Sequence, residues 1–285
     1  MTAEEALRLL SRAAGERYEL VRRLAGGETG AHECAAPDGR RVVVKWEQRP
    51  SSRVLRRKAV GLTDRLREQA GWPVPRQYMV ESDLCLFVIQ DFMPGAPVEL
   101  LTRGLVDRLL ELHATRLGLE RAEDESTWPD VLVPTLITGG VGYCLHEPLR
   151  KHDARTARLI ERIEQIGRDL DPRTLPGGDI VYWDLHLGNL LAARGELTAT
   201  IDTDFVTTGD AMFDLTSLAV SALGVACDPG VRRRLLDAGV DSLDDSRRQA
   251  YVGHLLLRNL DWAIRKERVE EIAFWLDTAD RLLAE

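Results

Sequence analysis

The stretch that decides the fold runs from Asp179 to Asp214, within GDIVYWDLHLGNLLAARGELTATIDTDFVTTGDAMFDL at residues 178–215. Asp184 is followed five residues later by Asn189, and a second acidic segment, IDTD, comes after a glycine turn. In this order the groups are typical of phosphoryl transfer, in which one carboxylate orients a hydroxyl while an amide and a later carboxylate hold Mg²⁺ on nucleotide phosphates. We therefore expect phosphoryl-transfer chemistry.

Length and charge limit the classes of protein that fit. The chain has 285 residues, 44% of them hydrophobic, which is enough for a sizeable core split into two lobes. Residues 1–95 carry 16 Lys/Arg against 13 Asp/Glu, whereas residues 201–285 carry 10 against 16. The net charge of −8 argues against nucleic acid as the main partner. The acidic C-terminal part fits a cationic small molecule or simply a solvated surface.

The spacing of the cysteines and the hydropathy of the chain indicate its cellular compartment. The four cysteines are far apart and form no C-x-x-C pair, so we expect reduced thiols and no zinc site or disulfide framework. No basic segment followed by an apolar run opens the chain, and the longest apolar run, 215–226, is too short to span a bilayer. We expect a soluble, cytoplasmic protein without a membrane partner.

The N-terminal part alternates between strands and two helices. Thr2 to Glu5 has the form of a capping box and predicts a helix over about residues 3–14. Pattern and turn residues predict a strand over Tyr18–Leu24, a strand ending at the turn Pro37-Asp38-Gly39, a strand over Arg41–Trp46, a helix over 52–70, and strands over Gln77–Val80 and Leu84–Phe92. Prolines and a glycine then mark Met93–Pro97 as a linker.

A glycine-rich hairpin precedes a lysine in an apolar strand. Gly26-Gly27-Glu28-Thr29-Gly30 lies between two strands, where glycines let backbone N–H groups approach a phosphate. Lys45 follows in the middle of RVVVKW, a position that suits a lysine pairing nucleotide phosphates. Either feature alone has an ordinary explanation, as a flexible turn or an edge lysine. Together they indicate a nucleotide site.

The remainder of the chain is mainly helical. Apolar spacing predicts helices around Leu105–Leu112, Leu159–Ile166, Leu215–Val225, Val231–Ala238, Ser246–Ile264 and Val269–Leu283. Residues 117–148 contain Trp128-Pro129 and Gly139-Gly140 and are expected to be irregular.

The order of these motifs resembles the aminoglycoside phosphotransferase family of small-molecule kinases. The resemblance covers about Glu19 to Leu283 and is most specific in DLHLGN and in the IDTD segment with the later GDAMFDL. It implies an α+β, bilobed protein-kinase-like fold with a small β-rich N-lobe and a larger, mostly helical C-lobe. The expected division is a nucleotide-binding lobe over residues 1–92, a hinge over 93–97, and a catalytic and substrate-binding lobe over 98–285.

The resemblance also implies roles for individual residues. Asp184 matches the catalytic carboxylate that orients the substrate hydroxyl, and Asn189 and Asp202 match the Mg²⁺ ligands, hard oxygen donors suited to that ion. The expected nucleotide is ATP, with GTP not excluded. Lys45 is expected to contact its phosphates, and the Asp91 carbonyl and the Met93 N–H of the hinge are expected to contact its base. The loop expected to cover the phosphates contributes Gly27, Thr29 and Gly30. Asp214 is expected to be structural.

Two positions depart from the family pattern. Relatives carry His-Gly before the catalytic Asp, whereas this chain has Tyr182-Trp183, which we expect to change the packing of the loop and its substrate side. Relatives also carry a Glu on the helix over 52–70 that pairs with the strand lysine. At that place this chain has Lys58, and Glu68 lies too near the helix end. The partner of Lys45 is therefore open, either phosphate alone or a carboxylate from another segment.

The expected acceptor is a hydroxyl of a small cationic molecule. An antibiotic is the first expectation, either an aminoglycoside or a basic cyclic peptide of the capreomycin/viomycin type. Carboxylates and indole faces attract cations, so the candidate substrate contacts are Trp183, Asp204, Asp228, Asp261 and Trp262. Each also has a structural explanation, since a loop Asp often caps a turn and a Trp often packs in a core.

Two alternatives stay open. One is a metabolic kinase for choline, homoserine or a sugar, which the motifs do not separate from an antibiotic kinase. The other is a pseudokinase that binds nucleotide without catalysis. The changed residues before Asp184 and the missing helix Glu favour the pseudokinase, whereas the retained Asp184, Asn189, Asp202 and Lys45 argue against it. The sequence does not give the oligomeric state.

Overall fold

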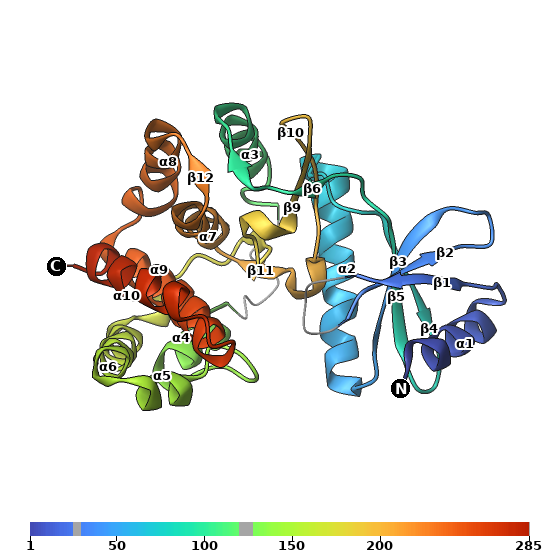
Figure 1. The fold of residues 1–285 in the computed structure, drawn as a ribbon, viewed down its shortest axis with the longest axis horizontal. Coiled ribbons are helices and arrows are strands. Elements are labelled where there is room, and N and C mark those ends of the chain that lie inside the picture. The colour runs from blue at the N-terminus through green and yellow to red at the C-terminus, as the bar shows by residue number, and fades with distance from the viewer. Residues whose placement is uncertain (25–29, 120–127, 285) are drawn as a thin grey trace.

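The computed structural model describes residues 1–24, 30–119 and 128–284. Two lobes lie side by side, a small sheet lobe with the N-terminus and a larger helical lobe with the C-terminus (Figure 1). The predicted combination of a β-rich N-terminal lobe and a mostly helical C-terminal lobe is confirmed. The domain boundaries at residues 92 and 97 remain predictions.

The small lobe is a five-stranded antiparallel sheet in the order β1-β2-β3-β5-β4. Its strands are β1 (Glu19–Arg23), β2 (His32–Ala35), β3 (Arg41–Glu47), β4 (Gln77–Glu81) and β5 (Leu86–Asp91). Helix α1 (Ala3–Ala14) begins at the predicted capping box of Thr2 and Glu5. Its Leu7 and Leu10 pack with Val42, Val44 and Phe87 in a core of this lobe.

Helix α2 (Pro50–Ala70) stands between the sheet and the larger lobe (Figure 1). Its buried Ala59, Leu62 and Leu66 belong to the same hydrophobic core as the helices of the larger lobe. The helix ends at Gly71, whose φ of 62° is left-handed and whose N–H is bonded to the Leu66 carbonyl, as in a common C-cap. The larger core therefore extends across α2.

The hinge is fixed to the larger lobe rather than free. Strand β6 (Ala96–Pro97) pairs with β9 (Leu190–Ala193), and the Val98 N–H donates to the Leu190 carbonyl at 3.1 Å. Gly95 has φ of 125°, and a Cβ there would lie 2.6 Å from Thr198 Oγ1, so only glycine fits. The predicted linker thus includes a short strand despite Pro97, because a proline is tolerated at the edge of a sheet.

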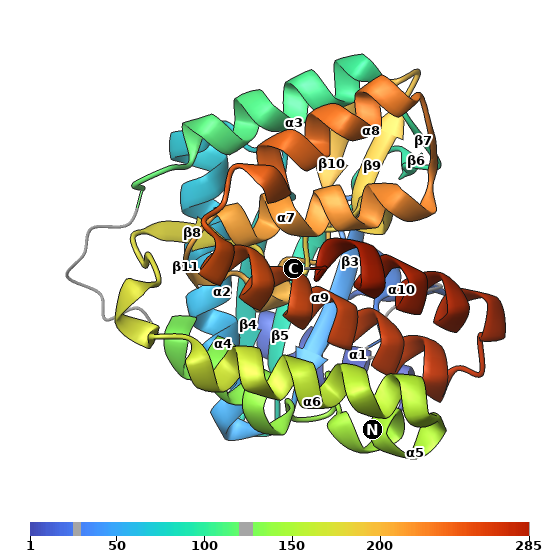
Figure 2. The same cartoon turned by 90° about the vertical axis from the view of Figure 1, so that its left-hand side faces the viewer.

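The larger lobe is built mainly from helices, with α3 and α8 at one end and α5 and α6 at the other (Figure 2). Its α-helices are α3 (Arg103–Thr115), α4 (Trp128–Thr138), α5 (His146–His152), α6 (Ala154–Asp169), α7 (Met212–Ser221), α8 (Pro229–Leu236), α9 (Asp245–Arg265) and α10 (Val269–Leu282). The short turns of helix are η1 (Pro172–Thr174), η2 (Leu187–Asn189), η3 (Thr203–Phe205), η4 (Ala222–Gly224) and the π-helical η5 (Asp237–Asp241).

Helices α4 and α5 correct the expectation that residues 117–148 are irregular. Pro129 is the second residue of α4, where a missing N–H costs no helical hydrogen bond. Pro134 lies inside the helix, which is held by buried Trp128, Leu132 and Leu136. Pro129 therefore marks the start of a helix and not a break between elements.

Short strands carry the central stretch of the sequence. β9 and β10 (Glu196–Thr200) form a hairpin, and β8 (Asp179–Val181) pairs with β11 (Thr207–Gly209). A further two-residue pair joins β7 (Leu100–Leu101) to β12 (Ala226–Cys227). No helix among the described residues is long and apolar enough to cross a membrane.

A fully buried ion pair joins α3 to α7. Arg116 and Asp214 both have side chains that are 0% exposed, and Arg116 Nη1 donates to Asp214 Oδ2 at 2.5 Å. Arg116 also donates to the carbonyls of Ala211 and Ile180. Burial raises the pKa of Asp214, and Arg116 works against that shift.

Arg116→Met should lower the free energy of unfolding by about 3–5 kcal/mol, because it leaves the Asp214 charge buried without its cation. Chemical denaturation measures the effect. Arg108→Met is the matched control, since Arg108 lies on α3 in an exposed pair with Glu111, and it should change stability by less than about 0.5 kcal/mol. Equal effects of the two substitutions would contradict the role of the buried pair.

Candidate active site

Backbone N–H groups hold the loop that carries Asp184. Asp214 Oδ2 accepts from the Tyr182 N–H at 2.6 Å and Oδ1 from the Trp183 N–H at 3.0 Å. The expected structural role of Asp214 is confirmed. Because the carboxylate grips the two residues directly before Asp184, the position of the loop is set by the buried ion pair with Arg116.

Trp183 occupies a backbone conformation that favours glycine. Its φ is 68°, in the left-handed region, which costs a non-glycine residue roughly 1–2 kcal/mol. A glycine at this position would adopt the same conformation without strain. The neighbouring departure also has a local reason, since the Tyr182 hydroxyl donates to the Thr200 carbonyl at 3.1 Å and so ties the loop to β10.

Packing of the indole offsets the backbone strain at Trp183. The ring is stacked on Phe213 at 5.2 Å and meets Trp128 and His254 edge-on, each at 4.9 Å. Trp183 is 6% exposed. This placement in the core does not favour the expected contact with substrate, and the change from Gly acts on the packing of the loop.

The Asp184 carboxylate is held from the C-terminal helices. Its side chain is 29% exposed, and Oδ1 accepts from Arg258 Nη1 of α9 at 3.0 Å. The same guanidinium donates to the Trp183 carbonyl and to Ser217 Oγ. Arg258 was not found from the sequence, because an arginine on a helix some seventy residues away gives no local signal.

His186 is placed to shape the loop. Its Nδ1 accepts from the Gly188 N–H at 3.1 Å, and its Nε2 lies 3.9 Å from Asp184 Oδ1, beyond a hydrogen bond. Burial lowers the pKa of His186, while Asp184 partly opposes that shift. The histidine is therefore neutral near pH 7 and supports the turn before Asn189.

Asn189 and Asp202 lie together at the ends of the β9–β10 hairpin. The Ile201 N–H, directly before Asp202, donates to the Asn189 carbonyl at 2.8 Å. The Asn189 side-chain amide donates to the Asp184 carbonyl at 2.9 Å, which leaves its oxygen directed elsewhere. The three residues of the Asp–Asn–Asp spacing are thus linked by backbone contacts into one site.

Lys45 finds its partners in the segment that follows Ile201. Lys45 Nζ donates to Asp202 Oδ1 at 2.7 Å and to Asp204 Oδ2 at 2.9 Å. The other oxygen of Asp204 is ion-paired with Arg56 of α2. A carboxylate from another segment, one of the two alternatives left open, is therefore the partner of Lys45.

The helix position facing this cluster is corrected by the structure. Arg56 is buried, whereas Lys58 is exposed. Asp204 is 8% exposed between Lys45 and Arg56, so the ion pairs, and not an open surface, explain this acidic residue.

The donor set fits a magnesium–nucleotide complex. Asn189 and Asp202 offer hard oxygen ligands, and Mg²⁺ is usually held by one or two carboxylates together with phosphates and water. The described residues contain no group of three His, Cys, Asp or Glu that could hold a metal ion. Asp202 has φ of 61°, a strained conformation of the kind found at functional sites.

The predicted nucleotide contacts are distributed over the small lobe and hinge. Lys45 is central in β3, opposite Val88. Asp91 ends β5, and Met93 follows in the hinge, partly buried. Gly30 has a left-handed φ of 68°, whereas the predicted contacts Gly27 and Thr29 lie outside the described residues.

The remaining predicted substrate residues come from two elements, with Asp228 at the start of α8 and Asp261 and Trp262 next to each other on α9. Asp261 is 0% exposed and accepts from Arg265 through both oxygens, at 2.9 and 3.0 Å. Lys266 Nζ lies 4.8 Å from the Trp262 ring centroid. Asp228 caps α8 by accepting from the Gly230 N–H. Each side chain already has a partner, so these three contacts remain proposals with little support from the geometry.

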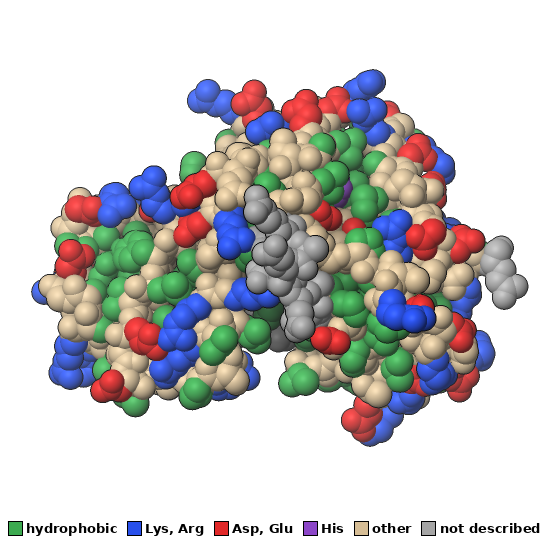
Figure 3. All heavy atoms as spheres, turned by 180° about the vertical axis from the view of Figure 1, so that it is seen from behind, with side chains coloured by type: hydrophobic (Ala, Val, Ile, Leu, Met, Phe, Trp, Pro, Cys, Tyr) green, Lys and Arg blue, Asp and Glu red, His purple; other side chains and the backbone are tan. Residues whose placement is uncertain are grey.

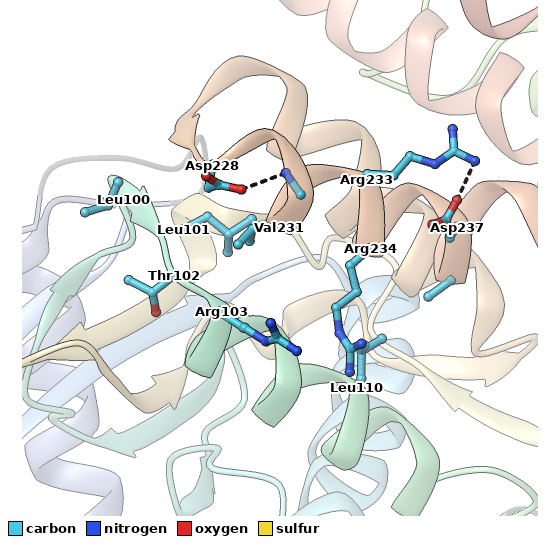
Figure 4. A pocket seen from close by; sticks show the side chains of 12 residues that line it. Leu100, Leu101, Thr102, Arg103, Leu110, Asp228, Val231, Arg233, Arg234 and Asp237 are labelled. Atoms are coloured by element: carbon cyan, nitrogen blue, oxygen red, sulfur yellow. Dashed lines mark hydrogen bonds and ion pairs between the residues drawn. The ribbon is translucent and has the colours of Figure 1, made fainter.

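A hollow of about 1090 Å³ lies between the start of α3 and α8 (Figure 4). It has an apolar side of Leu101, Leu110 and Val231, and charged side chains at its edge that include Arg234. Of the predicted site residues only Asp228 lines it. The hollow is therefore separate from the cluster around Asp184.

The fold and this cluster define a class of protein. A lysine on a small antiparallel sheet that faces an Asp–Asn–Asp hairpin in a helical lobe is the arrangement of protein-kinase-like phosphotransferases. The chain belongs to the phosphotransferase enzyme family, whose sequence profile matches residues 20–251. Membership confirms the predicted family and the enzyme class, an ATP-dependent phosphotransferase with an alcohol group as acceptor.

Solved structures share the fold at low sequence identity. Aminoglycoside phosphotransferase APH(4)-Ia with ADP and hygromycin B is 14% identical over 98% of this chain and 97% of that one, with a TM-score of 0.66. Spectinomycin phosphotransferase APH(9)-Ia with ADP and spectinomycin is 14% identical over 97% and 94%, at 0.61. A candidate fructosamine-3-kinase from Thermobifida fusca is 18% identical over the full length of both chains, at 0.61. No curated protein matches the sequence.

Trp183→Gly should be more stable than Trp183→Ala by about 1 kcal/mol, because only glycine adopts the left-handed backbone without strain. Both variants should be less stable than the native chain, since each removes a buried indole worth about 3–5 kcal/mol. Denaturant titration of the three proteins measures the order. An alanine variant more stable than the glycine variant would contradict the strained conformation.

Proposed function

We propose that the chain transfers the γ-phosphoryl group of ATP to a hydroxyl of a small, cationic molecule, with Mg²⁺ as cofactor. The observation that carries the proposal is the single site formed by Asp184, Asn189 and Asp202, with Lys45 bound to the last of them. Its parts match a mechanism in which positioning and charge neutralisation supply most of the rate enhancement.

Each side chain has a definite task in this mechanism. Asp184 accepts a hydrogen bond from the acceptor hydroxyl and takes its proton as the new P–O bond forms. Arg258 fixes the orientation of that carboxylate by its bond to Oδ1. Lys45 neutralises nucleotide phosphates, and Asn189 and Asp202 would hold Mg²⁺, which supplies further positive charge to the phosphoryl oxygens.

Support for a small-molecule acceptor comes from the family and from the surface. Charges of both signs are interspersed over the described residues on the face shown in Figure 3. Two of the solved structures that share the fold are complexes with hygromycin B and with spectinomycin. We therefore propose antibiotic inactivation as the role, with an aminoglycoside or a capreomycin/viomycin-type peptide as acceptor.

A metabolic kinase is the second candidate. The candidate fructosamine-3-kinase shares the fold over the whole of both chains. Of the three carboxylates proposed to attract a cationic antibiotic, Asp204 and Asp261 are paired with cations of the chain itself. This pairing weakens the electrostatic argument for an antibiotic and favours testing neutral acceptors beside it.

ADP formation should therefore be measured with Mg²⁺ and ATP against a panel of aminoglycosides, cyclic peptide antibiotics, choline, homoserine and amino sugars. Turnover that depends on one of the antibiotics is the expected result, and mass spectrometry should show one added phosphate. Turnover confined to a common metabolite would replace antibiotic inactivation by the metabolic role. ATP hydrolysis independent of every acceptor would contradict both.

Asp184→Ala should lower kcat by about 10²- to 10⁴-fold, the usual contribution of a general base. Nucleotide affinity should be unchanged, because Asp184 contacts the acceptor and not the phosphates. Calorimetry with AMP-PNP and steady-state kinetics check the two parts. The control is Asp171→Ala, at the residue that caps η1, whose side chain is 40% exposed and paired with Arg173. Equal rates for both variants would remove Asp184 from the mechanism.

A further inference from the structure

Four charged side chains form a chain of alternating sign beside the proposed metal site. Arg56 of α2 is paired with Asp204, Asp204 with Lys45, and Lys45 with Asp202. The two cations balance the two carboxylates. The order along the chain is therefore plus, minus, plus, minus, starting from the helix and ending at the metal ligand.

Burial separates the two carboxylates that hold Lys45. The side chain of Asp204 is 3% exposed, whereas that of Asp202 is 30% exposed. Asp204 has its two oxygens on different cations. Asp202 has one oxygen on Lys45 and opens toward the site where metal and phosphate are proposed to bind. Only Asp202 is placed to exchange Lys45 for another cation.

Geometry indicates a lasting pair between Asp204 and Lys45. The Lys45 Nζ and the Asp204 Oδ2 are 2.9 Å apart, and the two side chains are 9% and 3% exposed. Because buried pairs are little screened by salt, the bond persists at physiological ionic strength.

We propose that Arg56 and Asp204 are the positioning residues of Lys45. Arg56 orients the carboxylate of Asp204 from α2, and Asp204 keeps the ammonium of Lys45 in place. Asp202 is then free to bind Mg²⁺ when nucleotide enters. The inference rests on the proposed role of Lys45 as a phosphate contact.

The two carboxylates should differ in their effect on nucleotide binding. Asp204→Asn should weaken AMP-PNP binding by roughly tenfold or more, the scale of a lost bond between charged groups, and should leave the Mg²⁺ dependence intact. Asp202→Asn should remove most of that Mg²⁺ dependence. Isothermal calorimetry with and without Mg²⁺ separates them. Equal loss of Mg²⁺ dependence in both variants would overturn the division of roles.

Substitutions of Arg56 test the helix side of the pair. Arg56→Met should weaken AMP-PNP binding by about tenfold, and Arg56→Lys should restore most of the affinity because the cation is kept. Arg57→Met is the matched control on α2, since Arg57 is 41% exposed in a pair with Glu81, and it should bind normally. Native affinity in Arg56→Met would overturn the proposal.

A double substitution distinguishes positioning from a merely structural contact. Arg56→Glu places two carboxylates against each other, and adding Asp204→Asn removes that repulsion while leaving a carboxylate on the helix. The double variant should therefore bind AMP-PNP more tightly than Arg56→Glu alone. If the losses of AMP-PNP binding free energy in Arg56→Glu and Asp204→Asn simply add in a folded double variant, the coupling between Arg56 and Asp204 is overturned.

The same measurements separate this inference from the proposed function. If the native chain does not bind AMP-PNP with Mg²⁺, the proposed function fails. If the native chain binds and the Arg56 and Asp204 variants bind equally well, only the inference fails. Should Arg56→Met not fold, Arg56→Lys and the double variant decide the result.

Discussion

The carboxylate of Asp214 is the constraint on which the active-site arrangement depends. An ionised carboxylate without access to water must receive hydrogen bonds, and here its donors are Arg116 and the backbone of Tyr182 and Trp183. Satisfying one buried charge thus fixes the entrance to the catalytic loop, and Arg116 carries the constraint into α3. The loop is held by the interior of the lobe and not by its own sequence, which is why glycine before Asp184 is dispensable.

Much of the fold could be predicted from the sequence because its signals are local. The capping box at Thr2, the alternation in RVVVKW and the apolar spacing of the C-terminal helices depend on near neighbours, and the structure places these elements close to the predicted bounds. Helix α4 could not be predicted from the same signals. A proline after Trp128 is compatible with a break or with a first turn, and only packing in the larger core decides between them.

The sequence allowed prediction of the residues in the catalytic motif, but not of the distant residues that contact them. The spacing of Asp184, Asn189 and Asp202 indicated the chemistry because one hairpin brings them together. The partners of Lys45 and Asp184 come from segments distant in sequence, and their identification required the folded chain. Arg56 and Arg258 are two of many arginines on helices, and nothing local distinguishes them from exposed ones such as Arg57.

Because Arg56 lies on helix α2, the row of charged side chains connects the two lobes. Ala59, one turn after Arg56, is anchored in the larger core, and Asp204 also lies in that lobe, whereas Lys45 belongs to the sheet. The bond between Lys45 and Asp204 therefore connects the sheet to the larger lobe. The bond between Arg56 and Asp204 joins two residues that are both attached to the larger core. A rotation of the sheet relative to the larger lobe would lengthen the Lys45–Asp204 contact before it changed the Arg56–Asp204 contact. The separation of Lys45 Nζ from Asp204 would then serve as a gauge of how far the two lobes have opened.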